Sequence, residues 1–116
     1  MRYLCLVYYD EKKLEALSKE AFDTLVSDSL AYDDELRRGG HYVESAALQG
    51  VRAATTLRRR DGKATATDGP FAETKEQLGG FILIEAADRQ EALRLASKIP
   101  PGCLGSVEVR PVRDLE

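Results

Sequence analysis

The chain has 116 residues, a length that fits one domain, and 43% of the residues are hydrophobic while 32% are charged. The net charge of −3 argues against the basic field that drives nucleic acid binding, and no apolar run approaches the roughly 20 residues of a membrane span. The first residues lack the cleavage site of a signal peptide. We therefore expect a single cytoplasmic domain over 1–116, with neither nucleic acid nor membrane as a partner.

Residues 2–9, RYLCLVYY, are almost continuously apolar, which predicts a central strand covered on both faces. A long helix is predicted next, because Ser18 suits its N-cap and Gly39-Gly40 suit its end. The apolar stripe of this helix consists of Phe22, Leu25, Tyr32 and Leu36.

Three short segments with turn residues between them follow, at 41–48, 52–60 and 61–69, and they predict an antiparallel excursion. Within it, Asp61-Gly62 is a strong hairpin signal, so Arg58, Arg59 and Arg60 are expected at a solvated hairpin tip. The acidic balance of the chain favours this interpretation over a nucleic acid contact.

Residues 81–86, FILIEA, predict another strand, and Asp88 with Glu91 predicts the capped start of a second helix. The expected buried stripe of this helix is Ala92, Leu93, Ala96 and Ile99. Pro100-Pro101 end the helix, and alternating polarity in 105–112 predicts a closing strand. The resulting order is a ferredoxin-like βαββαβ fold of the α+β class with an inserted β-hairpin.

Two helices can cover only one face of the predicted sheet. The strands at 2–9 and 81–86 nevertheless carry apolar residues at both alternating positions, so the second face also needs a cover. A second copy of the chain is the simplest cover, which predicts a homodimer with a barrel-like interior.

The segment TDGPFAETKEQLGGF, from Thr67 to Phe81, combines turn chemistry, charge and paired glycines. Through Asp68-Gly69-Pro70-Phe71, through 73–81 and through GSVEVRPV at 105–112, the chain resembles the DGPF branch of the YCII-related proteins. The resemblance runs from end to end and implies a dimeric α/β barrel without an assigned reaction. Proteins of this branch resemble products often encoded beside extracytoplasmic-function sigma factors.

Asp68 is the candidate catalytic residue, because the Gly69-Pro70 turn could deliver its carboxylate to the mouth of a cleft. The alternative is that Asp68 only forms the turn and that Phe71 is a hydrophobic plug. Lys75 could present a cation to an anionic ligand beside Asp68, or form local ion pairs with its neighbours. The Gly79-Gly80 pair serves either as a hinge or as a site of close backbone packing.

Further candidates for ligand binding lie on the first long helix. Ser29 and Asp33 share its inner side, and together with Tyr8 or Tyr32 they could supply the polar groups of a small-molecule site. Alternatively, Ser29 bonds to a helix carbonyl and Asp33 reaches solvent. His41, the single histidine, fits a surface role or a proton-transfer role.

The broader YCII group typically carries a histidine on the first helix, paired with an acidic residue. This chain departs from that pattern, because Ser29 or a close neighbour occupies the position. One histidine and two widely separated cysteines predict no metal site and free thiols, and no nucleotide-binding motif calls for a cofactor.

The favoured hypothesis is that the protein binds a small organic molecule in a cleft. If the protein is catalytic, Asp68 would carry out acid–base chemistry such as isomerisation or elimination. The alternative is a non-catalytic regulatory or stress-response accessory protein associated with extracytoplasmic-function sigma factors. A third option is an interaction module without a ligand.

Overall fold

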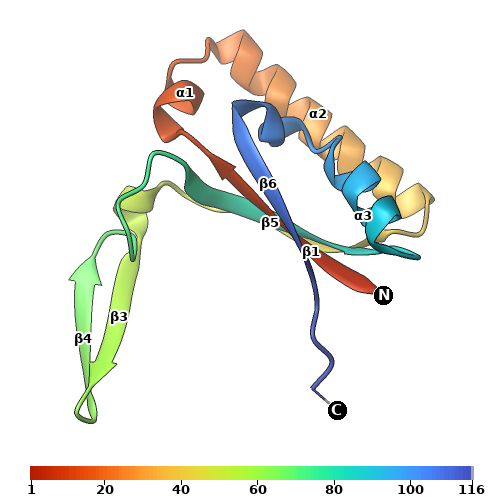
Figure 1. Ribbon diagram of the computed structural model, residues 1–116. Coiled ribbons are helices and arrows are strands. Elements are labelled where there is room, and N and C mark those ends of the chain that lie inside the picture. Colours follow the sequence, from red (N-terminus) through yellow and green to blue (C-terminus); the bar gives the residue numbers. More distant parts are fainter. Residues whose placement is uncertain (116) are drawn as a thin grey trace.

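The fold consists of one four-stranded antiparallel sheet, helices on one of its faces and a separate hairpin that projects from it (Figure 1). The computed structural model describes residues 1–115. The sheet order is β2-β5-β1-β6, formed by β1 (Arg2–Tyr9), β2 (Tyr42–Ala47), β5 (Gln77–Glu85) and β6 (Gly105–Pro111). The predicted ferredoxin-like α+β order with an inserted hairpin is confirmed.

Strand β1 lies at the centre of the sheet, between β5 and β6, as its continuous apolar sequence predicts. Its alternate residues Tyr3, Cys5 and Val7 face the helices, and Tyr3 and Cys5 lie opposite Ile84 and Ile82 of β5. Cys5 is fully buried, and burial raises the pKa of its thiol to about 11. Both Cys5 and the exposed Cys103 are free thiols, as expected.

Helix α2 (Lys19–Arg38) is the long helix predicted from the apolar spacing. The Ser18 hydroxyl accepts a hydrogen bond from the Ala21 amide at its start, and the helix ends at Gly39. Gly40 follows with a φ of 78°, a left-handed conformation that favours glycine. A one-turn helix that the sequence did not predict, α1 (Glu11–Glu15), connects β1 to α2.

Helix α3 (Arg89–Ala96) is capped as predicted, since Asp88 accepts a hydrogen bond from the Glu91 amide. The predicted buried stripe of this helix is wrong at one residue. Leu93 is 39% exposed, whereas Leu95 is buried beside Ala92 and Ala96. The rotation of this short helix about its axis is set by packing on the sheet, which apolar spacing alone does not define. A 3₁₀ helix, η2 (Pro100–Leu104), follows it.

The arm is the hairpin formed by β3 (Thr55–Arg60) and β4 (Lys63–Asp68), which pair only with each other. Its turn is Asp61-Gly62, with φ values of 51° and 78°, so the three arginines lie at the tip as predicted. The prediction that all three segments of 41–69 form a separate antiparallel unit is wrong for the first segment, because 42–47 forms β2 in the main sheet. Strand β2 finds its hydrogen-bonding partner in the free edge of β5.

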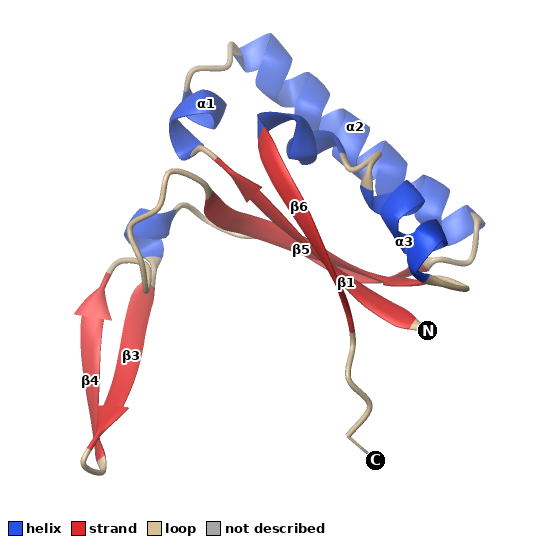
Figure 2. Cartoon of the chain, in the orientation of Figure 1, coloured by secondary structure: helices blue, strands red, loops and turns tan. Residues whose placement is uncertain are grey.

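The open face is the side of the sheet that the helices do not cover. Figure 2 shows the helices on one side of the sheet and the arm directed away from them. Partly exposed apolar side chains line the open face from the two central strands: Leu4, Leu6, Tyr8, Phe81 and Leu83.

Candidate functional site

The α2 cleft is a cavity of about 430 Å³ between the first half of helix α2 and the β2–β5 edge of the sheet. It exists because α2 packs closely on the sheet only near its C-terminal end. Leu36 is 2% exposed, but Phe22 and Val26 are each 42% exposed towards the N-terminal end. The predicted apolar stripe is therefore divided, and its first half lines the cleft.

The walls of the α2 cleft are mostly apolar and come mainly from three parts of the chain. The helix contributes Leu25 and Leu30, the sheet contributes Val7 and Ile82, and η2 closes one end with Pro100 and Pro101. The polar side chains in this lining are Tyr9, Ser29, Asp33 and Ser45. A volume of this size with few polar groups is typical of small-molecule sites.

Asp33 is held in the wall of the cleft by a short chain of hydrogen bonds. The Ser45 hydroxyl donates to Asp33 Oδ2 at 3.3 Å, and the Tyr42 hydroxyl lies 2.7 Å from Ser45 Oγ. Because Ser45 donates its one proton to Asp33, the Tyr42 hydroxyl acts as the donor to Ser45. The Arg37 guanidinium stacks on the Tyr42 ring, 4.1 Å from its centroid. This arrangement links the carboxylate to the edge strand β2.

Burial is the main influence on the Asp33 carboxyl group, and it raises the pKa. The Ser45 hydrogen bond and the Arg37 charge lower this pKa, and the neighbouring Asp34 raises it, so the net direction is upward. A carboxyl group with a raised pKa can exchange a proton more readily near neutral pH. Asp33 therefore has the surroundings expected of a general acid or base.

Ser29 lies one helical turn before Asp33 and also lines the cleft. Its hydroxyl donates to the Leu25 carbonyl at 2.7 Å, which is the helix-bonded alternative considered from the sequence. The oxygen can still accept a hydrogen bond from a ligand while it donates its own proton to the helix.

The paired glycines Gly79 and Gly80 allow close packing along the floor of the α2 cleft. A Cβ on Gly79 would lie 2.2 Å from the Tyr9 ring, and a Cβ on Gly80 would lie 2.7 Å from the Ala46 carbonyl oxygen. Close packing at this pair is thus confirmed. Burial, followed by the charge of Glu11, raises the pKa of Tyr9. Sequence reasoning missed Tyr9 and Ser45 because neither belongs to a recognisable motif.

A second cavity, the arm-base cleft, has a volume of about 890 Å³ and lies where the arm joins the sheet. Tyr8 and Phe71, both candidates from the sequence, line it together with Pro70 and Leu78. Phe71 is 78% exposed, so it does not plug the body of the domain. The sequence candidates are thus divided between two cavities, with Ser29 and Asp33 in the α2 cleft and Tyr8 and Phe71 here.

Four other candidates line neither cleft: Tyr32, Asp68, Lys75 and His41. Tyr32 is buried in the core, where its hydroxyl donates to the Leu95 carbonyl at 2.5 Å and ties α2 to α3. Asp68 is exposed on β4 opposite Thr55, and Lys75 is exposed in the loop that leads to β5.

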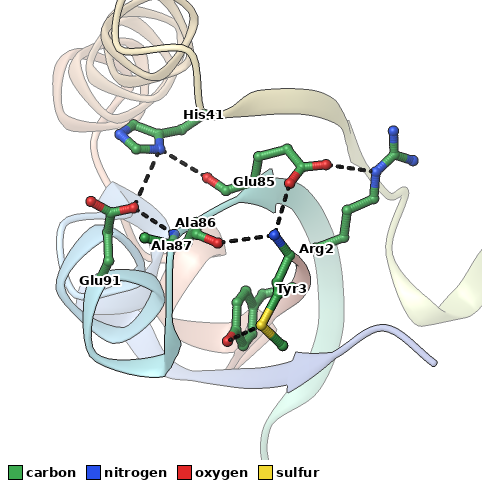
Figure 3. Close-up of polar contacts among 8 residues, drawn as sticks. Arg2, Tyr3, His41, Glu85, Ala86, Ala87 and Glu91 are labelled. Carbon is green, nitrogen blue, oxygen red and sulfur yellow. Dashed lines mark hydrogen bonds and ion pairs between the residues drawn. The ribbon is translucent and has the colours of Figure 1, made fainter. Parts of the chain in front are cut away.

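His41 lies at the start of β2, away from both clefts, in a cluster of polar contacts at the sheet end (Figure 3). Its Nδ1 is 2.8 Å from the Glu85 carbonyl oxygen, and a carbonyl can only accept, so Nδ1 carries the proton. Glu91 lies 4.0 Å from the same nitrogen and accepts from the Ala87 amide at 2.9 Å. These contacts connect the end of α2 to the start of α3.

Within residues 1–115, no group of three potential metal ligands gathers at one place. None of the helices in the same range is long and apolar enough to cross a membrane.

Comparison with known proteins gives a family match over the whole chain. A family model described as the YCII-related domain matches residues 1–116. An uncharacterised protein of Rhizobium meliloti (strain 1021) is 41% identical over 114 residues, which cover 97% of this chain and 92% of that protein.

A solved structure has a similar fold. It is 5-chloro-2-hydroxyhydroquinone dehydrochlorinase from Burkholderia phenoliruptrix in complex with 2,5-dihydroxybenzoquinone. The match has a TM-score of 0.53 and 16% sequence identity, and it covers 97% of this chain and 94% of the dehydrochlorinase. At this identity the similarity concerns the fold.

Proposed function

Because this chain belongs to the YCII-related domain family, and because its α2 cleft combines apolar walls with one carboxyl group, we propose that it binds a small phenol-like molecule in that cleft. The observation that carries the proposal is the placement of Asp33, which lies in an apolar wall, has a raised pKa and is held by Ser45. The apolar walls suit an aromatic ring, and the carboxylate suits a hydroxyl group that donates a hydrogen bond.

The ligand of the dehydrochlorinase supports this choice of class. That protein is described in complex with a dihydroxybenzoquinone, a six-membered ring with polar groups at its edge. A ring of that size fits a cavity of about 430 Å³. In this chain, the Asp33 carboxylate favours a neutral hydroxyl over an anionic group, because two negative charges at close range repel.

If the protein is an enzyme, the cleft suits simple acid–base chemistry. The Asp33 carboxylate would accept a proton from a ligand carbon beside a carbonyl group, breaking the C–H bond and forming an O–H bond on Asp33. Return of that proton to another ligand atom completes an isomerisation. In an elimination, the C–H electrons form a new double bond, the leaving group departs with its bonding electron pair, and Asp33 then releases the proton to water. Ser45 would hold the carboxylate oriented for either step.

The proposal is tested with a thermal-shift comparison of phenol, 4-chlorophenol and benzoate at pH 7. We expect both phenols to raise the melting temperature by several degrees at about ten times Kd, where binding contributes about 1.4 kcal/mol. Benzoate is expected to give a smaller shift, because its charge opposes that of Asp33. In Asp33→Asn, the phenol shift should fall by more than half and the benzoate shift should increase.

The stability of the free Asp33→Asn variant provides an internal check. Burial raises the folded-state pKa of Asp33 above its unfolded value. The ionised group therefore costs stability above the folded pKa, and this cost disappears as the pH falls below the unfolded value. At pH 7 the asparagine variant should not melt earlier, so a lost ligand shift would reflect lost binding. Glu15→Gln, an exposed change of the same charge outside the cleft, is the control.

Asp68→Asn belongs in the same comparison, because Asp68 remains the alternative acid–base group. Asp68 closes the arm beside Gly69, whose amide donates to the Ala54 carbonyl at 2.8 Å. We expect Asp68→Asn to keep the phenol shift, which would assign Asp68 to the turn. Loss of the phenol shift in Asp68→Asn but not in Asp33→Asn would contradict the assignment of the ligand to the α2 cleft.

We also propose that the chain belongs to the DGPF branch of the family and forms a homodimer through the open face. The DGPF turn supports the branch assignment, since Gly69 has a φ of 107° and so favours glycine. The apolar residues of the open face support the dimer. Multi-angle light scattering should give twice the chain mass at micromolar concentration, and a monomer mass would contradict the dimer.

A further inference from the structure

We propose that the arm packs against a second copy of this chain and places its basic tip against acidic residues on helix α2 of the partner. This inference rests on the homodimer proposed above and adds a second contact region to it.

Beyond its base, most of the arm is exposed to solvent. All six residues of β4 are exposed, and Leu57 on β3 is 69% exposed. Two-stranded hairpins without further packing are marginally stable in water. The arm also extends the molecule, because the radius of gyration is 16.0 Å, against roughly 13–14 Å for a compact chain of this length. A partner surface would supply the missing packing.

The base of the arm is fixed, so the direction of the arm is defined. The Thr56 hydroxyl donates to the Gly69 carbonyl at 2.8 Å, and the Arg58 guanidinium donates to the Phe71 carbonyl at 3.0 Å. From this base the arm runs away from the helices, on the side of the sheet that the open face occupies (Figure 2). A second copy covering the open face would therefore lie beside the arm.

The length of the arm suits such a contact. Six residues of β-strand extend about 20 Å, and packed sheets lie about 10 Å apart. The arm can thus pass the edge of a partner sheet and bring its tip to the partner's helices. One face of the arm presents Leu57, Ala64 and Ala66 together with the charged Arg59, because Leu57 and Arg59 lie opposite Ala66 and Ala64. We assign this face to the contact.

Charge complementarity selects a second copy as the occupant. Residues 58–63 at the tip carry a net charge of +3, so the rest of the chain carries −6 to give the total of −3. Glu20, Asp28 and Glu35 are exposed on α2, and none of them forms an ion pair within residues 1–115. A cationic tip and three acidic side chains of α2 that form no ion pair within residues 1–115 are complementary between two copies.

The test compares two double variants of the arm by sedimentation. Each double variant lowers the net charge of the arm by three. Leu57→Asp with Arg59→Glu alters the proposed contact face, and Arg60→Glu with Thr65→Asp makes the same change in charge on the opposite face. We expect both pairs to raise the dimer Kd, because both remove the positive charge of the tip, and we expect the first pair to raise it at least threefold more, because it also alters the contact face. Equal effects of the two pairs would refute the assigned face.

Removal of the arm gives a second, independent measurement. Ala54 and Gly69 are hydrogen-bonded neighbours, so two glycines can replace residues 55–68 without moving the sheet. We expect a folded protein by circular dichroism with a dimer Kd at least tenfold higher. A dimeric wild type whose Kd is unchanged by the deletion would refute the arm contact alone, whereas a monomeric wild type would refute the homodimer itself. Arm-dependent binding of a single-stranded DNA oligonucleotide with an unchanged dimer Kd would also overturn the proposal.

Carbodiimide cross-linking of a mixed ¹⁴N and ¹⁵N sample identifies the contact directly. Lys63 lies at the tip, and the reagent joins lysines to carboxylates that they touch. We expect mixed-isotope links from Lys63 to Glu20, Asp28 or Glu35. If both peptides in every Lys63 cross-link carried the same isotope, the links would lie within one chain, and this result would contradict the contact.

Discussion

Alanine at Gly80 is expected to lower the free energy of unfolding by about 1–3 kcal/mol, the usual cost of forcing extra volume into a packed site. The new Cβ would lie 2.7 Å from the Ala46 carbonyl oxygen of the neighbouring strand. Both atoms belong to or adjoin backbone that is paired between β2 and β5, so relief requires the strands to separate locally. Urea unfolding followed by circular dichroism measures the effect, since the chain has no tryptophan.

Gly79→Ala is the matched control for this prediction. Its Cβ would meet the ring of Tyr9, a side chain that can rotate away, instead of a carbonyl of a paired strand. We expect a smaller loss of stability, together with a change in ligand binding, because Tyr9 lines the α2 cleft. If Gly79→Ala proved the more destabilising of the two, the backbone contact at Gly80 would not be the dominant constraint.

Truncation of Ile84 to alanine is expected to be the most destabilising change proposed, at about 2–5 kcal/mol. Ile84 is 1% exposed and lies opposite Tyr3 in the layer between sheet and helices. Truncation would leave a cavity that the surrounding β-sheet cannot collapse to fill. Chemical unfolding should give this loss at every protein concentration, because the site lies within one chain.

The adjacent Leu83→Ala tests the opposite side of the same strand. Leu83 points to the open face and is partly exposed in the single chain. If a second copy covers it, the loss of stability should grow with protein concentration, since binding between copies stabilises the native state by mass action. A concentration-independent effect below about 1 kcal/mol would indicate that the face is solvated.

Local signals in the sequence were sufficient for most of the fold. Ser18 and Asp88 predict helix starts because each side chain satisfies a free amide, a contact that needs no information from the rest of the chain. The Asp61-Gly62 turn is local in the same sense. The assignment of residues 42–47 required more, because β2 joins the sheet only through its partner β5, more than 30 residues later.

The candidate site was predicted less completely. Ser29 and Asp33 were selected from helical spacing, and they do share a cleft, but Ser45 reaches Asp33 from another element. Spacing along one helix cannot reveal such a partner. Tyr32 has the same spacing as its neighbours, yet it is buried because α2 approaches the sheet at that end only. The tilt of a helix on a sheet depends on packing that single-residue patterns do not encode.

The two thiols differ enough in environment to be useful in the laboratory. A thiol with a pKa near 11 in the core resists alkylation, whereas the sulfur on η2 is open to reagents. A maleimide dye should therefore attach at one position, Cys103, without any mutation. Because η2 also carries Pro100 and Pro101 at the end of the α2 cleft, the emission of that dye would provide a fluorescent report of ligand entry in the native sequence.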